Sequence, residues 1–91
     1  MELRAQPAAY VISGDNGGYL YKGSTRDLAA RWAEHAAGRV PRTRCRHPLK
    51  LVYVEYFDQY TDARRREIFL KTGVGRVFIK AQVAKWQTQG T

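Results

Sequence analysis

The sequence predicts a small α/β domain of the α+β type, in which strand-like segments alternate with helical ones. Two strand-like runs flank a glycine-rich turn, a third run is apolar on both of its faces, and three segments carry helical patterns. Because 91 residues support one small core, we expect one domain over residues 8–85. An N-terminal tail over residues 1–7 and a frayed C-terminal tail over residues 86–91 would flank it.

The first two strands should form a hairpin. Residues 8–13 and 19–23 are rich in tyrosine and aliphatic side chains, and the segment Gly14–Gly18 between them contains the Asp, Asn and Gly residues of tight turns. If the turn has an even number of residues, the numbers of cross-strand partners sum to 33, whereas an odd turn would break this parity.

In the even register Tyr10 faces Gly23, and Ile12 faces Tyr21. The two tyrosines then share one face as diagonal neighbours, and Gly23 leaves space beside them. Two interpretations remain open: tyrosines that are ordinary strand residues, or two phenols that line a pocket.

The remaining elements follow in order. A helix is predicted over residues 26–37, between cap-forming residues and a glycine. Residues 49–57 are apolar on both faces, which predicts a strand in the centre of the sheet. A second helix is expected over residues 61–72, an interruption at 73–75, and a third helix over 76–86.

The chain is strongly basic. It has 16 Lys and Arg against 8 Asp and Glu, a formal charge of +8, which favours a nucleic acid partner over a charge that only maintains solubility. Residues 39–48, which we call the basic connector, lack an apolar period and are either a solvated loop or a phosphate-binding segment. The candidate nucleic-acid-binding residues are Lys22, Arg39, Arg42, Arg44, Arg46 and Lys50.

Several classes of protein are excluded by composition. Cys45 is the only cysteine, so an internal disulfide and a zinc site built from paired thiolates are both excluded. No apolar run approaches the roughly 20 residues of a membrane span, and the first residues do not resemble a signal peptide. We therefore expect a cytoplasmic protein without a membrane partner.

The first helix places two polar residues beside its apolar stripe. Leu28, Trp32 and Ala36 form the stripe, and Arg31 and His35 lie one turn apart along its edge. They are either structural residues at the border of the core, or a phosphate-binding guanidinium and a titratable imidazole.

The second helix has a carboxylate at a core position. Ala63, Glu67 and Leu70 fall on one stripe, and a buried carboxylate needs a partner. An ion pair with Arg66 or Arg31 would satisfy Glu67, and so would Mg²⁺, whose other ligands can be water and substrate phosphate.

Taken together, these segments resemble the GIY-YIG nuclease domain, in particular its small stand-alone bacterial members and, more remotely, the N-terminal nuclease domain of the bacterial repair excinuclease. The resemblance extends from Ala8 to Lys80. It rests on Ala8–Tyr10, Tyr21–Gly23, the Gly-Ser-Thr-x-Asp-Leu run that ends at Leu28, Arg31, Glu34–His35, His47–Tyr53, Arg66–Glu67 and Leu70–Arg76.

The resemblance implies a small three-stranded antiparallel sheet flanked by helices, and hydrolysis of DNA phosphodiester bonds with one divalent metal, Mg²⁺ or Mn²⁺. By matching position, Glu67 would bind the metal and Arg31 the scissile phosphate. Tyr10 and Tyr21 would line the site, with one of them activating or positioning the water. His35 would be the general base or would orient it.

The chain departs from the family pattern at two positions. Ser24 stands where some members have a lysine, and no asparagine follows Glu67 at the place where some nucleases use one; Lys22 and Arg76 are candidate replacements. The expected function is a structure- or damage-directed endonuclease of DNA repair or recombination, acting on branched, nicked or damaged DNA, with a possible protein partner. The alternatives are a basic nucleic-acid-binding module that keeps the fold without cleaving, and a structural RNA-binding protein.

Overall fold

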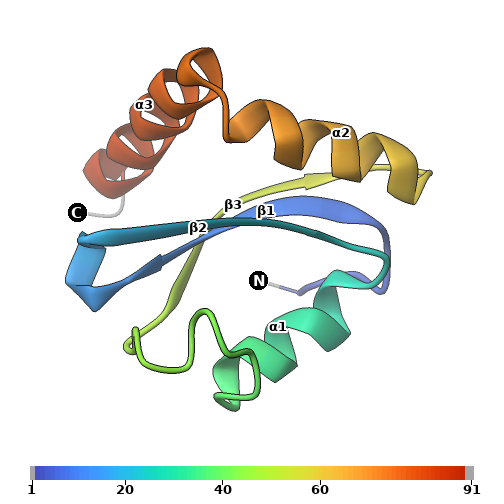
Figure 1. The fold of residues 1–91 in the computed structure, drawn as a ribbon, viewed down its shortest axis with the longest axis horizontal. Coiled ribbons are helices and arrows are strands. Elements are labelled where there is room, and N and C mark those ends of the chain that lie inside the picture. The colour runs from blue at the N-terminus through green and yellow to red at the C-terminus, as the bar shows by residue number, and fades with distance from the viewer. Residues whose placement is uncertain (1, 90–91) are drawn as a thin grey trace.

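The computed structural model describes residues 2–89 and contains one sheet between two helical layers (Figure 1). Helix α1 (Leu28–Ala36) and the basic connector lie on one side of the sheet, and helices α2 (Tyr60–Leu70) and α3 (Gly73–Gln89) lie on the other. This confirms the predicted α+β class with a three-stranded antiparallel sheet. Among residues 2–89, no helix is both long and apolar enough to span a bilayer.

The elements are β1 (Ala8–Gly14), β2 (Tyr19–Thr25), α1 (Leu28–Ala36), β3 (Lys50–Tyr56), α2 (Tyr60–Leu70) and α3 (Gly73–Gln89).

The sheet has the order β2-β1-β3, so β1 is the central strand and all seven of its residues are buried. The prediction that residues 49–57 form the central strand is wrong, since β3 lies at an edge. Helices cover both faces of the sheet, and β3 contributes Leu51 to the packing on one face and Val52 to that on the other. An edge strand that is covered on both faces is therefore apolar on both parities, as a central strand is.

The predicted hairpin register is confirmed: Tyr10 pairs with Gly23, and Ile12 with Tyr21. The connection is a single 3₁₀ turn over Asp15–Gly17, whose three residues all have positive φ angles, 52°, 56° and 101°. Asp, Asn and Gly tolerate this left-handed conformation best, so the turn residues themselves fix the register.

Two separate cores form on the two faces of the sheet. The core below α1 contains Tyr10, Ile12 and Leu28, with Tyr21 and Trp32 packed against it. The core below α2 and α3 contains Val11 and Val52 from the other face of the strands, together with Leu70 of α2 and Ile79 and Val83 of α3.

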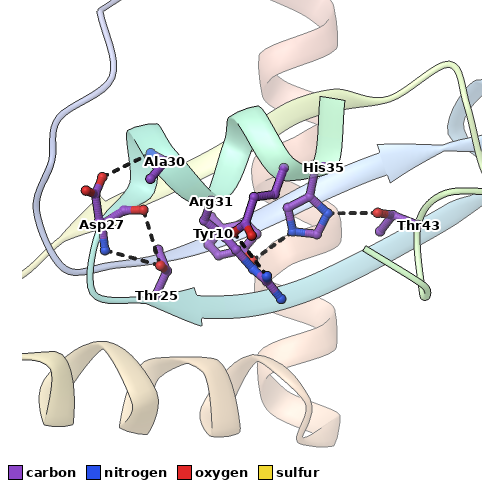
Figure 2. A network of polar contacts seen from close by, with 8 residues as sticks. Tyr10, Thr25, Asp27, Ala30, Arg31, His35 and Thr43 are labelled. Atoms are coloured by element: carbon purple, nitrogen blue, oxygen red, sulfur yellow. Dashed lines mark hydrogen bonds and ion pairs between the residues drawn. The ribbon is translucent and has the colours of Figure 1, made fainter. Parts of the chain in front are cut away.

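Helix α1 begins later than predicted, after Asp27, whose carboxylate accepts a hydrogen bond from the Ala30 amide (3.0 Å, Figure 2). The predicted stripe is also shifted: Ala36 is exposed, whereas His35 is fully buried rather than placed at the edge. The inward face of α1 is thus rotated toward the imidazole, which becomes part of the interior.

Helix α3 begins at Gly73, so the prediction that residues 73–75 interrupt the helical segments is wrong in detail. These residues form its first turn, in which the Gly75 amide donates to the Thr72 hydroxyl (3.0 Å). A Cβ at Gly75 would stand 1.9 Å from the carbonyl oxygen of Phe69. Glycine at this position therefore lets α3 start directly against the end of α2.

Both predicted tails contain ordered contacts or helix. The carbonyls of Arg4 and Gln6 accept hydrogen bonds from the first two amides of α1, at 3.1 and 3.2 Å. At the other end, α3 continues to Gln89, into the segment 86–91 where a tail is predicted. Residues 90–91 of that segment lie outside the described residues.

Candidate active site

Three aromatic rings from three elements meet on the α1 side of the sheet. Tyr10 of β1 and Tyr21 of β2 have ring centroids 6.3 Å apart, and His35 of α1 lies 5.7 Å from Tyr10 and 5.4 Å from Tyr21. A Cβ at Gly23 would stand 2.7 Å from the Tyr10 hydroxyl and 2.9 Å from the Tyr21 ring. The missing side chain at Gly23 therefore leaves room beside the strand, and the rings of Tyr10 and Tyr21 occupy this room.

A chain of hydrogen bonds runs through this cluster (Figure 2). The Tyr10 hydroxyl lies 3.0 Å from His35 Nε2, and His35 Nδ1 lies 2.8 Å from the Thr43 hydroxyl. Arg31 also interacts with the Tyr10 hydroxyl. Since a guanidinium only donates, the Tyr10 oxygen accepts from Arg31, and the two ring nitrogens of His35 link this oxygen to the Thr43 hydroxyl.

Burial determines how the inner members of this chain titrate. Burial, together with the nearby Tyr21, raises the pKa of Tyr10 to about 12. Burial, together with the positive charge of Arg31, lowers the pKa of His35 to about 4. Both side chains are therefore neutral at physiological pH, and the expectation of an imidazole that acts directly at the border of the core does not fit a fully buried His35.

The outer members of the cluster reach the surface. The Arg31 side chain is 36% exposed and lies 3.3 Å from Glu34. Burial opposes its charge, but the bonds with Tyr10 and Glu34 prevail and raise the pKa of Arg31. Tyr21 is partly exposed, and within residues 2–89 its hydroxyl has no hydrogen-bond partner. Arg31 and Tyr21 are thus the members of the cluster that are partly exposed to solvent.

Glu67 lies on the other side of the sheet, on α2. Its side chain is only 9% exposed; the Ser24 hydroxyl donates to Oε1, and the Lys71 ammonium and the Arg64 guanidinium (2.9 Å) contact Oε2. Burial acts to raise the pKa of Glu67, but the bonds from Lys71, Ser24 and Arg64 outweigh it and lower the pKa. The carboxylate is therefore ionised at neutral pH.

The predicted ion-pair partners of Glu67, Arg66 and Arg31, are wrong. Arg66 bonds Glu55 instead, at 2.9 Å, and Arg31 belongs to the cluster across the sheet. Residues three or four positions apart share a helix face, whereas adjacent residues do not. This spacing selects Arg64 and Lys71, and the same rule applied to the sequence finds them. Lys71 and Arg64 are therefore the two cations that contact the carboxylate.

Glu67 offers a single carboxylate at this place, and Arg64 and Lys71 already pair with it. Among the described residues, no group of three or more acidic, histidine or cysteine side chains gathers around a common point. Mg²⁺ and Mn²⁺ can be held by one carboxylate if water and phosphate oxygens supply the other ligands. Lys71 and Arg64 are about half exposed, so a cation could bind Glu67 only by displacing these two side chains from the carboxylate.

The five predicted site residues are thus arranged around β2 rather than in one cluster. Tyr10, Tyr21, Arg31 and His35 gather on the α1 side, and Glu67 contacts Ser24 on the α2 side of the same strand. The charge of Glu67 still contributes to the raised pKa of Tyr10. Four further residues contact these side chains, namely Thr43, Ser24, Lys71 and Arg64. Of these, the sequence singles out only Ser24.

Comparison with known families decides the assignment. The GIY-YIG catalytic domain family matches residues 6–77, which is most of the chain. The chain belongs to the GIY-YIG family. It therefore has a nuclease-type fold, in a superfamily of endonucleases.

Small proteins of this family are similar to the chain. A UPF0213 protein of Staphylococcus haemolyticus is 44% identical over 54 residues, 58% of this chain and 66% of that protein. A UPF0213 protein of Halobacterium salinarum is 44% identical over 63 residues, 68% of this chain and 80% of that protein. One of Staphylococcus saprophyticus is 36% identical over 64 residues, 69% of this chain and 77% of that protein. No solved structure matches the chain significantly.

The basic connector of this GIY-YIG domain is folded against the sheet. Val40 and Thr43 are buried, so it is not a loose loop. Arg46 is used within the fold, because it pairs with Asp15 at 2.8 Å and lies over the Tyr19 ring at 4.4 Å from its centroid. The other predicted phosphate-binding residues of this region are exposed, namely Arg39, Arg42, Arg44 and Lys50.

Proposed function

We propose that this GIY-YIG domain is a metal-dependent DNA endonuclease that hydrolyses phosphodiester bonds, directed by DNA structure or damage in repair or recombination. The observation that supports this most is that two partly exposed side chains, Arg31 and Tyr21, both adjoin the buried Tyr10 and its hydrogen bond to His35. Branched, nicked or damaged DNA is the proposed substrate. Nothing in the connector favours readout of base sequence, so specificity would come from DNA shape or from a protein partner.

Arg31 is proposed to bind the scissile phosphate. Its guanidinium carries five donors, of which Tyr10 and Glu34 engage part. The remaining donors can hold a phosphate oxygen in a charge-assisted bond and stabilise the negative charge that grows in the transition state. Tyr10 and His35 are proposed to fix the orientation of Arg31 through the bonds that link them to Thr43.

Tyr21 is proposed to meet the attacking water. Of the candidate bases Tyr10, Tyr21 and His35, it is the one that combines partial exposure with a hydroxyl lacking a partner in residues 2–89. It would position this water, or accept its proton as the general base. His35 would act on this step only through Tyr10.

Glu67 is proposed to hold the divalent cation, Mg²⁺ or Mn²⁺. When bound, such a cation neutralises charge on the phosphate and lowers the pKa of coordinated water. Lys71 and Arg64 would have to leave the carboxylate to admit it. Ser24 would continue to orient Oε1 through its hydroxyl.

A second candidate function is a binding module that keeps the fold without cleaving DNA. The observation that favours it is that Glu67 is already neutralised by two cations of its own chain. In this reading Arg39, Arg42 and Arg44 would bind the phosphate backbone, and the carboxylate would only stabilise the contact of α2 with β2.

Nicking assays on branched, nicked and single-stranded DNA with Mg²⁺ or Mn²⁺ separate the two. The endonuclease should lose cleavage but retain DNA binding in Glu67→Gln and in Arg31→Ala. Asp58→Asn is the matched control, since Asp58 is an exposed acid without an ion pair in the described residues. If the wild type cuts none of these substrates, yet binds them with a steep salt dependence, the binding module is correct.

A further inference from the structure

Four cations gather on the α2 and α3 side of the edge strand β2, and we call them the basic patch: Lys22, Lys71, Arg76 and Lys80. Lys22 pairs across the strands with Val11, which belongs to the core below α2 and α3. Because side chains alternate along a strand, Lys22 shares this face with Ser24. The Ser24 hydroxyl and the Lys71 ammonium bond the same carboxylate, which brings Lys71 close to Lys22.

The start of α3 brings the other two cations to the same place. Its first turn is pressed against the end of α2, where a Cβ at Gly75 would collide with Phe69. Arg76 follows directly, and Lys80 lies one helical turn further on the same face. Burial and the charges of Arg76, Lys80 and Lys71 lower the pKa of Lys22, which shows that all three lie within electrostatic reach of it.

The positive charge of the basic patch is not balanced within the fold. In the part of the chain that the structure describes, Lys22, Arg76 and Lys80 form no ion pair, and Lys71 shares Glu67 with Arg64. Like charges held close together are unfavourable unless an anion joins them. A polyanion is the natural ligand of such a surface, because it neutralises several charges at once.

The basic patch and the basic connector lie on opposite sides of the sheet (Figure 1). A single DNA strand bound along the connector has no second phosphate backbone that could reach the basic patch on the far side of the sheet. A duplex has two phosphate backbones, one for each surface. We propose that the basic patch is a second phosphate-binding surface, and that double-stranded DNA bound at the β2 edge contacts the patch with one backbone and the connector with the other. This proposal rests on the proposed function for the DNA partner, but it does not require cleavage.

Fluorescence anisotropy with a labelled duplex, measured over a range of salt concentrations, tests the basic patch. The double variant Arg76→Gln/Lys80→Gln should reduce the slope of log Kd against log salt by about 1.8, since each lost phosphate contact removes about 0.9. The control Arg65→Gln/Lys85→Gln removes the same charge from exposed positions outside both surfaces and should leave the slope nearly unchanged. All four residues are exposed, so the fold is preserved.

A single-stranded oligonucleotide gives the complementary measurement. Arg42→Gln/Arg44→Gln in the connector should lower the slope for duplex and single strand alike, whereas the patch variant should lower it for the duplex only. An unchanged duplex slope in the patch variant, or an equal loss on single strands, overturns the proposal. Absence of cleavage by the wild type would refute the endonuclease without changing these results, and absence of DNA binding would refute both.

Discussion

The stability of the domain should fall as the pH drops toward 5, because of His35. Burial and the charge of Arg31 lower the pKa of His35 from 6.5 to about 4. Between these values the unfolded chain binds a proton that the folded chain does not, so this contribution to stability is complete above pH 6.5 and is lost as the pH falls. At about 1.36 kcal/mol per pH unit, a change from pH 7.5 to 5 should lower the free energy of unfolding by about 2 kcal/mol.

Urea denaturation at several pH values between 7.5 and 5 measures this loss, and the upper part of the range avoids the titration of carboxylates. His35→Gln should remove most of the pH dependence, whatever its effect on stability at pH 7.5. His47 is exposed and provides the control, because His47→Gln should keep the pH dependence of the wild type. In NMR spectra of the wild type, the imidazole signals of His35 should not titrate over this range. Equal pH dependence in wild type and His35→Gln, or an imidazole that titrates near pH 6.5, would refute the reasoning.

Three further substitutions test the packing and hydrogen bonds by urea denaturation. Gly23→Ala should lower the free energy of unfolding by roughly 1–3 kcal/mol, since its methyl group would overlap two tyrosine rings. Gly18→Ala is the control: its methyl group would make no contact closer than 3.4 Å, so it should cost far less. Thr43→Val leaves a buried imidazole nitrogen without its hydrogen-bond partner and should cost about 1–3 kcal/mol. The same change at the exposed Thr61 should cost less than about 0.5 kcal/mol. Gly75→Ala should be the most damaging, because the overlapping atoms are backbone. Equal losses within either pair would contradict these contacts.

The sequence predicts what local chemistry determines. The residues of the turn at Asp15–Gly17 fix the hairpin, and the register that follows brings Tyr10 and Tyr21 to one face with Gly23 between them. The cap at Asp27 likewise marks the start of a helix, with an error of two residues. These signals depend on neighbours within a few positions, which is why they can be read without the fold.

Features that depend on distant segments could not be predicted in the same way. An edge strand covered on both faces has the composition of a central one, so only the pairing of β1 with both neighbours reveals the order. The helical pattern places His35 at the border of the core, because a helical wheel does not include the connector that covers it. Thr43, the partner of its ring, is one polar residue among arginines, and nothing in the sequence marks it as buried.

In the proposed function, the arrangement around β2 would let a domain this small bring two kinds of chemistry to one substrate. Alternation along the strand places Tyr21 and Gly23 on the α1 side, and Lys22 and Ser24 on the side of α2 and Glu67. Because β2 is an edge strand, a ligand at its outer edge is next to both faces without entering the domain. A phosphate there would be near the Tyr21 face and near the carboxylate held by Ser24. A shift of the hairpin by one residue would exchange the two faces. The proposed site therefore depends on the turn that fixes the register as much as on the side chains that do the chemistry.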